Sequence, residues 1–473
     1  MFNTPEFALA FIAFIIIYNI LPNKCKKYFL FVFNYIYAYA IGGISTILVL
    51  CSVAFMTYCY GLLMEKYHRL RKFFLYVFII CSLGVLFYGK YLNFFLQTKS
   101  KILGGETESI DIVVMIGISY YLLSAIGYAI DLYKEKYNAE RNLGVLMLWL
   151  AFFPKLIAGP VEKYESFQQS LDNLDSYGFN PDVLKRGLLV MAWGYFLKII
   201  IADRLSLFVD SVYADIDNMP SAVILAAVLI YSLQIYTDFA GYSYIALGAA
   251  LAMGLKITNN FNHPYFAKSI TEFWRRWHIS LSTWLKEYIY IPLGGNRKGK
   301  LRQNVNLMIT FLVSGLWHGA AWHYVVWGGV HGLFQVIEKN CSLKIKSENS
   351  IFHILKIVKN YIIVSFAWVF FRADTMPDAI RVIANIFSFK RGDFFDYLTI
   401  NIDKSDWTII AIAVIFMFVI ELAQYKNISI YQKIQEKNVV VRWIFYYGVV
   451  VVLLIFGIYG PGYNASEFIY FKY

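Results

Sequence analysis

The chain has 473 residues, of which 59% are apolar and only 16% charged, and its mean hydropathy is +0.54. Soluble domains are typically ~45–50% apolar and about 25% charged, so this composition excludes an ordinary soluble enzyme and predicts an all-α polytopic membrane protein. The net charge of +12 comes from basic residues spread between apolar segments, which fits membrane topology and argues against nucleic-acid binding. The five cysteines show neither CxxC spacing nor a Cys/His cluster, so we expect buried free thiols without a disulfide framework or a metal site.

Apolar runs follow one another without a Pro/Gly/Ser-rich linker, which predicts one membrane domain over residues 1–473. The first run has neither a basic start nor a small-residue cleavage site, so we interpret it as a retained helix. A span needs ~20 residues, so we expect roughly 11–13 membrane helices, with the shorter runs tilted, re-entrant or interfacial. The runs cover residues 7–21, 28–40, 44–64, 73–89, 112–132, 143–158, 184–202, 221–254, 305–316, 320–337, 354–371, 407–424 and 439–460.

Basic clusters follow the first, third and fifth runs and predict the orientation of the chain. Because Lys and Arg concentrate in cytoplasmic loops, these clusters place the N-terminus outside. The last loop is also basic, so the final run should cross outward and leave the tail, 461–473, on the extracytoplasmic side. The clusters are Lys24, Lys26 and Lys27, then Lys66, Arg69, Arg71 and Lys72, then Lys134, Lys136 and Arg141, and finally Lys426, Lys433, Lys437 and Arg442.

The segment 259–303 differs from a plain membrane helix because it holds charges, His, Trp, two prolines and a Gly-Gly turn. Such residues at membrane depth are costly unless they line a cavity, so a functional site is the first hypothesis. The alternative is an amphipathic helix on the cytoplasmic face, with Arg275, Arg276 and Lys286 at lipid head groups. For the arginines both interpretations stay open, whereas His278 favours a functional site.

Three histidines fall in the next apolar stretch, 314–332. His318 lies in a run apolar enough to be buried, so its imidazole should be neutral and able to accept a proton, as a general base must. From the pattern alone, catalysis and packing stay equally open for His318. His323 and His331 share one helix face, and we interpret them as packed, hydrogen-bonded residues. No i, i+4 pair with a nearby carboxylate is present, which argues against a metal site.

Several motifs occur in order and resemble the membrane-bound O-acyltransferase superfamily, specifically the bacterial branch typified by the alginate O-acetyltransferase membrane subunit. The resemblance runs from the fifth apolar run to the F-F-R-A at 370–373. The motifs are P-K-L-I-A-G-P-V-E-K-Y-E-S-F (154–167), Y-S-L-Q-I-Y-T-D-F-A-G-Y-S (231–243), F-W-R-R-W-H-I-S-L-S-T-W-L (273–285), Y-I-P-L-G-G-N-R (290–297) and L-W-H-G-A-A-W (316–322).

The resemblance implies a ring of tilted helices around a thinned centre, with a tunnel from a cytoplasmic donor to an acceptor on the other face. It implies N-terminal helices in 1–142, a catalytic core in 143–371 and C-terminal helices in 407–460. His318 corresponds to the family's catalytic base and His278 to its other histidine. The oxyanion donors stay open among Trp, Asn and backbone N–H groups near Asn296 and His278. Arg275, Arg276, Asn296 and Arg297, together with Lys298, are candidates for binding the CoA donor, with the cations at its phosphates; positive-inside anchoring is the alternative for the cations.

The chain ends in F-I-Y-F-K-Y, 468–473. This resembles the Phe/Tyr-rich terminal motif of the small membrane peptide of teichoic-acid D-alanylation, whose last tyrosine is proposed to carry the acyl group. By that resemblance Tyr473 is the acyl carrier here. A phenol has a pKa of ~10, far below that of an alkyl alcohol, so its ester keeps more transfer potential. The alternative is an aromatic anchor at the membrane interface.

The predicted function is transfer of an acyl group, most simply acetyl from acetyl-CoA, across the bacterial cytoplasmic membrane to an envelope polysaccharide. The expected partners are the lipid membrane and an extracytoplasmic, SGNH-hydrolase-like transferase that completes the reaction. The runner-up keeps the fold but takes D-alanine or another acyl group from an acyl carrier protein. A polymer-precursor transporter would show an internal repeat with paired broken helices, which the sequence lacks, and a scaffold role would not need His318. The polymer stays open.

Overall fold

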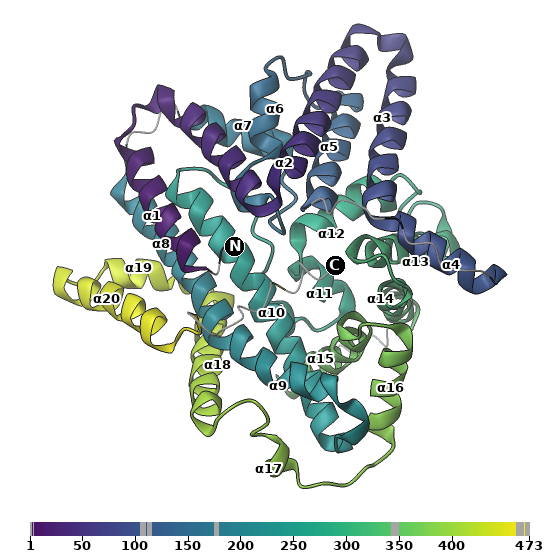
Figure 1. Cartoon of the computed structure of the whole chain (residues 1–473), viewed down its shortest axis with the longest axis vertical. Coiled ribbons are helices and arrows are strands. Elements are labelled where there is room, and N and C mark those ends of the chain that lie inside the picture. Colours follow the sequence, from purple (N-terminus) through teal and green to yellow (C-terminus); the bar gives the residue numbers. More distant parts are fainter. Residues whose placement is uncertain are drawn as a thin grey trace. The chain divides into compact units, whose positions relative to one another are not determined.

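A computed structural model describes residues 2, 4–104, 110, 116–174, 179–341, 350–459 and 468. Within these ranges the chain forms helices and no strand (Figure 1), which confirms the predicted all-α class. Each predicted apolar run contains a helix, in the predicted order, but α2 covers two of the runs and further helices form between the runs. In chain order they are α1 (Pro5–Ile20), α2 (Asn23–Lys66), α3 (Arg71–Leu86), α4 (Leu92–Leu103), α5 (Ile118–Tyr133), α6 (Leu143–Leu150), α7 (Tyr164–Asn173), α8 (Pro181–Tyr195), α9 (Asp203–Ala214), α10 (Ser221–Ala252), α11 (Ile270–Arg276), α12 (Ile279–Leu285), α13 (Gly299–His318), α14 (Trp322–Asn340), α15 (Ser350–Arg372), α16 (Met376–Phe387), α17 (Phe394–Tyr397), α18 (Lys404–Tyr425), α19 (Ile430–Gln435) and α20 (Val439–Phe456).

Six helical stretches among the described residues are long and apolar enough to cross a membrane, so the protein is a multi-pass membrane protein. The helices in the remaining apolar runs do not combine the length, hydropathy and low charge of these six stretches. The number of spans predicted above therefore stays a prediction. The six stretches are Asn23–Lys66, His68–Leu103, Ser221–Ala252, Ile351–Arg372, Lys404–Tyr425 and Val439–Phe456.

α2 shows how two predicted runs became one element. A straight helix of 44 residues would be about 66 Å long, twice the ~30 Å hydrocarbon core. Gly43 interrupts it with φ 64° and ψ −164°, a conformation that glycine adopts without steric cost. The break separates the predicted runs 28–40 and 44–64, and Figure 1 shows the two halves as separate legs.

The contacts between residues group the chain into two compact units that interleave in sequence. The first contains Ala10–Gly187 and Ala246–Thr258, and in it α2 packs against α3, α5 and α6. The second contains Phe2–Leu9, Leu188–Ile245 and Asn259–Tyr473. The segment that carries the candidate site, 259–332, lies in the second unit.

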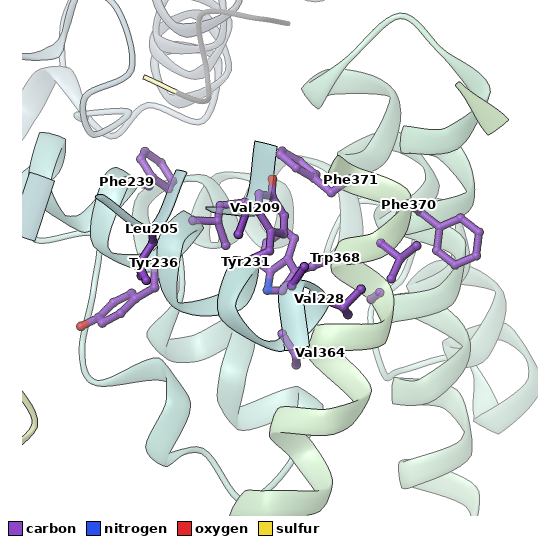
Figure 2. Close-up of a cluster of buried hydrophobic side chains, with 14 of the residues drawn as sticks. Leu205, Val209, Val228, Tyr231, Tyr236, Phe239, Val364, Trp368, Phe370 and Phe371 are labelled. Carbon is purple, nitrogen blue, oxygen red and sulfur yellow. The ribbon is translucent and has the colours of Figure 1, made fainter. Parts of the chain in front are cut away.

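The core of the second unit is built from α9, α10 and α15, with further contributions from α11, α13 and α14. Figure 2 shows large buried side chains from these helices meeting between their axes, among them Trp368 and Tyr231. Two members of this cluster, Phe239 on α10 and Phe371 at the end of α15, also contact the candidate site described below.

α13 and α14 form a tightly packed pair, which holds the turn between them in place. Glycines at the crossing allow this approach: a Cβ on Gly315 would lie 2.2 Å from the carbonyl oxygen of Tyr324, and one on Gly328 would lie 2.2 Å from that of Phe311. His318 is the last residue of α13, so this packing fixes its backbone.

One expectation about the cysteines was wrong. All five are free thiols, but none of them is buried: Cys25, Cys81 and Cys341 are exposed and Cys51 and Cys59 are half-buried. Four of them lie on α2 and α3, within the candidate spans. A thiol on such a helix can face lipid, so it is in apolar surroundings without being buried in a protein core.

Candidate active site

His278 occupies the break between the short helices α11 and α12. Its backbone is left-handed, with φ 44° and ψ 54°, which is uncommon for a residue with a side chain and marks positions held by their surroundings. Two hydrogen bonds to Asn260 fix the backbone after His278. The carbonyl oxygen of Asn260 accepts from the N–H of Ile279 at 3.0 Å, and its Oδ1 accepts from the N–H of Ser280 at 3.1 Å. The first backbone donors after His278 are therefore already bound, so they are not oxyanion donors.

α11 is itself fixed at its N-terminus. The hydroxyl of Ser269 accepts from the N–H of Glu272, and the carboxylate of Glu338 accepts from the N–H groups of Ile270 and Thr271. These bonds satisfy donors that a helix start leaves free. Glu338 thus has a structural role that sequence reasoning missed.

His318 ends α13, and the following Gly319 is extended. Its imidazole lies within an aromatic enclosure, with ring centroids 4.8 Å from Trp317, 4.9 Å from Trp327 and 5.5 Å from Phe371. Only 3% of the residue is exposed. The packing between α13 and α14 and the end of α15 together set its position.

The structure brings together the two histidines singled out in the sequence. Their ring centroids are 6.4 Å apart with an interplanar angle of 63°, and Trp317 also contacts His278 at 6.0 Å. The ring of Phe239 also contacts His278, with 4.8 Å between the two ring centroids. His278 is fully buried and lies outside the six candidate spans, and burial lowers the pKa of its imidazole to about 3. It is therefore neutral at physiological pH and keeps one ring N–H to donate.

The other two histidines of the stretch are packed and hydrogen-bonded, as the sequence indicated. His323 Nδ1 lies 2.9 Å from the carbonyl oxygen of Phe370, and His331 Nδ1 accepts from Trp274 Nε1 at 3.3 Å. Both residues are buried. Their ring nitrogens thus have structural partners that do not involve the His278–His318 pair.

Arg275 and Arg276 are adjacent but lie in different environments. The Arg276 guanidinium pairs with Glu272, donates to the carbonyl oxygen of Asn262 and lies over the ring of Tyr425, so it is engaged within the protein. Arg275 is exposed, and the pKa of Lys339 is lowered by partial burial of its ammonium and, to a smaller extent, by the charge of Arg275. Arg275 and Lys339 therefore lie close together at the surface.

Asn296 and Arg297 lie on the exposed turn before α13, whereas His278 and His318 are buried. Asn296 Oδ1 accepts from the Tyr290 hydroxyl and from Gln303 Nε2. Lys339 extends over the ring of Tyr290 at 6.0 Å, which links this turn to the Arg275 region. The exposed cations Arg275, Lys339, Arg297 and Lys298, here called the basic surface, share this part of the second unit. An oxyanion role for Asn296 has no support in this position.

Sequence reasoning missed a buried ionic cluster on α10 and the π-helical turn η4 (Phe196–Ala202). Lys198 Nζ lies 2.8 Å from Asp203 Oδ1 and also pairs with Asp238, and all three residues are buried. Ionisable residues within apolar runs are a functional signal in membrane proteins, and both Lys198 and Asp238 stand in such runs.

The proposed carrier Tyr473 lies outside the described residues. One residue of the terminal motif is described: Phe468, which is buried, with Lys198 Nζ 4.5 Å from its ring centroid. Phe468 therefore packs against protein side chains.

The chain is similar to known membrane-bound acyltransferases. The model described as MBOAT, membrane-bound O-acyltransferase family, matches residues 146–371. A probable alginate O-acetylase AlgI of Azotobacter vinelandii is 34% identical over 90% of this chain and 84% of its own length. A peptidoglycan O-acetyltransferase of Helicobacter pylori is 30% identical over 81% of this chain and 79% of its own length. A teichoic acid D-alanyltransferase of Streptococcus thermophilus is 29% identical over 50% of this chain and 59% of its own length.

The match to the alginate O-acetylase covers most of both proteins, and the family model covers the segment that holds both central histidines. These findings confirm the resemblance drawn from the motifs. The protein is an O-acyltransferase of the membrane, and the chain belongs to the membrane-bound O-acyltransferase family.

Proposed function

We propose that this enzyme takes an acyl group, most simply acetyl, from a cytoplasmic thioester and passes it across the bacterial cytoplasmic membrane for O-acylation of an envelope polysaccharide. The observation that carries the proposal is the buried pair His278–His318, whose ring centroids lie 6.4 Å apart inside an aromatic enclosure. Relatives named for alginate and peptidoglycan acetylation support a polymer as final acceptor and acetyl as the acyl group.

His318 is the general base of this proposal. It accepts the proton of an attacking hydroxyl while that oxygen forms a bond to the thioester carbonyl carbon. The carbonyl oxygen becomes an oxyanion, and the ring N–H of neutral His278 donates to it. When the intermediate collapses, the C–S bond breaks, the sulfur leaves with its electron pair, and His318 returns the proton to the thiolate. The products are an ester and a free thiol.

The basic surface is the proposed site for the donor's phosphates. Arg275, Lys339, Arg297 and Lys298 are exposed, so they attract an anion without the cost of burying an unpaired charge. Arg276, which is bound to Glu272, is left out of this role. The positive-inside rule places these residues on the cytoplasmic side, where acetyl-CoA is available.

The acceptor of the first transfer is the hydroxyl of Tyr473. The same charge rule puts both termini on the extracytoplasmic side, because α20 follows the basic last loop and crosses outward. A phenyl ester at Tyr473 retains enough transfer potential for a second step, in which an SGNH-hydrolase-like partner moves the acyl group to a sugar hydroxyl. Tyrosine then regains its proton and the cycle restarts.

The experiment is mass spectrometry of the C-terminal peptide from membranes incubated with isotope-labelled acetyl-CoA. Wild-type protein should carry the label on Tyr473, and His318→Ala should lose at least 100-fold of it at equal protein level, because a positioned general base contributes ~10²–10⁴-fold. Tyr473→Phe is the matched control for the site of labelling, since it removes only the hydroxyl.

Each other outcome contradicts a separate part of the proposal. Labelled polysaccharide without label on Tyr473 would exclude the carrier step and indicate direct transfer. Label on Tyr473 that persists in His318→Ala would exclude His318 as base. Transfer from D-alanyl carrier protein but not from acetyl-CoA would favour the runner-up donor, in line with the match to a teichoic acid D-alanyltransferase.

A further inference from the structure

Glu421 is a buried carboxylate in the candidate span α18, where only 8% of the residue is exposed. A carboxylate in such a helix is costly unless the protein pairs it, so its partners indicate what it does. The hydroxyl of Tyr236 on α10 donates to Glu421 Oε1, and His263 Nδ1 lies 3.7 Å from Glu421 Oε2. In Figure 2 this hydroxyl points away from the hydrophobic cluster. Glu421 thus joins α18 to α10 and to the segment that follows α10.

His263 has a backbone conformation that its surroundings must hold. Its φ is 48° and its ψ 59°, in the left-handed region, and the next residue is Pro264. Left-handed backbone is uncommon for a residue with a side chain, and a following proline favours an extended backbone instead. Besides Glu421, the ring of Tyr425 contacts His263, with 6.4 Å between the ring centroids. Tyr425 lies one helical turn after Glu421, so the end of α18 contacts His263 at two points.

The segment that ends at His263 holds His278 from both sides. The N–H of Asn262 donates to the carbonyl oxygen of Arg276 at 2.9 Å, two residues before His278. Asn260 accepts from the two N–H groups that follow His278. The left-handed backbone of His278 therefore depends on where this segment lies.

The residues around Glu421 contact this segment a second time. The Arg276 guanidinium lies 5.3 Å from the ring centroid of Tyr425, and its Nη1 donates to the carbonyl oxygen of Asn262 at 3.2 Å. Tyr236, which donates to Glu421, packs against Phe261 with 5.7 Å between the ring centroids. The end of α18 and its partner on α10 thus hold both backbones of the pairing that fixes His278.

We propose that Glu421 is a positioning residue, which orients Tyr236 and His263 and through them sets the backbone that holds His278. This rests on the proposed function, since it assumes that the ring N–H of His278 stabilises the oxyanion. A preorganised donor acts only at the correct place, and a misplacement of ~1 Å caused far from the chemistry can cost about 10²-fold in rate. The role requires no contact between Glu421 and the substrate, so its effect should pass through His278.

The backbone effect is tested first, without acyl chemistry, by hydrogen–deuterium exchange of the full chain in membranes. The N–H groups of Asn262, Ile279 and Ser280 are hydrogen-bonded and should exchange slowly. Glu421→Leu should raise their exchange rate about fivefold or more, because local opening becomes less costly. Glu421→Gln should raise it less, because its amide oxygen still accepts from Tyr236, and it keeps the test available if the Leu variant does not fold.

Asp406→Asn is the matched control for both variants. It removes another carboxylate of α18, one that pairs with Arg204 and not with the segment before His278. Exchange in the peptides that contain Asn262, Ile279 and Ser280 should match that of the wild type. Unchanged exchange in both Glu421 variants, or an equal rise in the control, would overturn the proposal.

The link to chemistry is tested by a double-mutant cycle between Glu421 and His278. The readout is the rate at which label from isotope-labelled acetyl-CoA enters ester product, whichever acceptor carries it. Glu421→Gln should lower kcat about tenfold with KM unchanged. In the His278→Ala background the same change should cost no more than about twofold, because the group that Glu421 positions is gone. Equal losses in the two backgrounds would overturn the positioning.

The failures are distinguishable. Faster exchange in the Glu421 variants, with no loss of rate in His278→Ala, would support the backbone role of Glu421 and contradict the oxyanion role that the proposed function gives His278. A loss of rate in the Glu421 variants with unchanged exchange would overturn the positioning and leave the proposed function intact.

Discussion

Two groups of candidate functional residues lie in the second unit, and they differ in how the protein holds them. His278 and His318 are buried among aromatic rings and fixed by Asn260 and by the close packing of α13 and α14. The basic surface is exposed, and its cations depend on water as much as on protein contacts. Chemistry at the buried pair should therefore respond to the loss of one side chain, whereas anion binding at the basic surface should change gradually with charge and salt.

After the loss expected for His318→Ala, the largest effect is expected at His278. His278→Ala should lower the rate of acyl transfer about 10²–10³-fold, because one preorganised oxyanion donor contributes that much. The loss should appear in kcat, since the donor acts on charge that develops only in the transition state. Single-turnover labelling with acetyl-CoA measures it, and equal expression and melting temperature of His278→Ala provide the control. A rise in KM with unchanged kcat would contradict this role.

The burial of His278 also predicts a dependence of stability on pH. Its pKa is about 3 in the folded protein and ~6.5 when unfolded, so between these values the unfolded chain binds a proton that the folded chain does not. The free energy of unfolding should therefore be unaffected by this group above pH 6.5 and fall as the pH decreases, by roughly 2–3 kcal/mol at pH 4.5. Thermal denaturation of the solubilised protein measures this. His278→Gln should flatten the slope, and an unchanged slope would show that His278 is not its source.

A smaller effect is expected at the basic surface. Arg275→Gln should raise KM for acetyl-CoA about two- to fivefold with kcat unchanged, the size expected for one solvated charge on an anion. Acetyl-dephospho-CoA, which lacks one phosphate, should show less discrimination between the two enzymes, and so should high salt. Arg276→Gln is the matched control: it should lower stability through Glu272 and leave KM close to wild type. An equal rise in KM for both variants would mean that the residues attract the donor only by overall charge.

The helices could be predicted from sequence because each apolar run is local, and even the break in α2 was visible as a gap between two runs. The motifs that carry the family resemblance also identified His278 and His318. Their arrangement could not be predicted: the two residues lie 40 positions apart, and only the packing of α10, α13 and α15 brings them within 6.4 Å. Asn260, which fixes His278, gave no signal of its own.

The burial and the local environment of individual side chains were the other properties that could not be predicted from the sequence. Asn296 stands in a motif close to His278 in the chain, yet the structure has it exposed on a turn, so nearness in sequence suggested a role that the fold does not support. Arg275 and Arg276 carry the same charge, but a salt bridge with Glu272 four residues earlier separates their environments. The sequence shows Lys198 and Asp238 as charged residues in two separate apolar runs. Only the structure shows that these two residues form an ion pair.

The smallest expected effect distinguishes two kinds of histidine within the stretch 314–332. His323 lies five residues after His318 and bonds the carbonyl oxygen of Phe370, so His323→Ala should cost about 1 kcal/mol of stability, the net value of one hydrogen bond. Acyl transfer should stay within twofold of wild type. His323→Asn offers an amide N–H at a similar position and should recover most of the lost stability. Melting temperature and labelling rate are measured on the same preparations. A large loss of labelling rate at normal stability would show that His323 takes part in acyl transfer and would contradict its structural role.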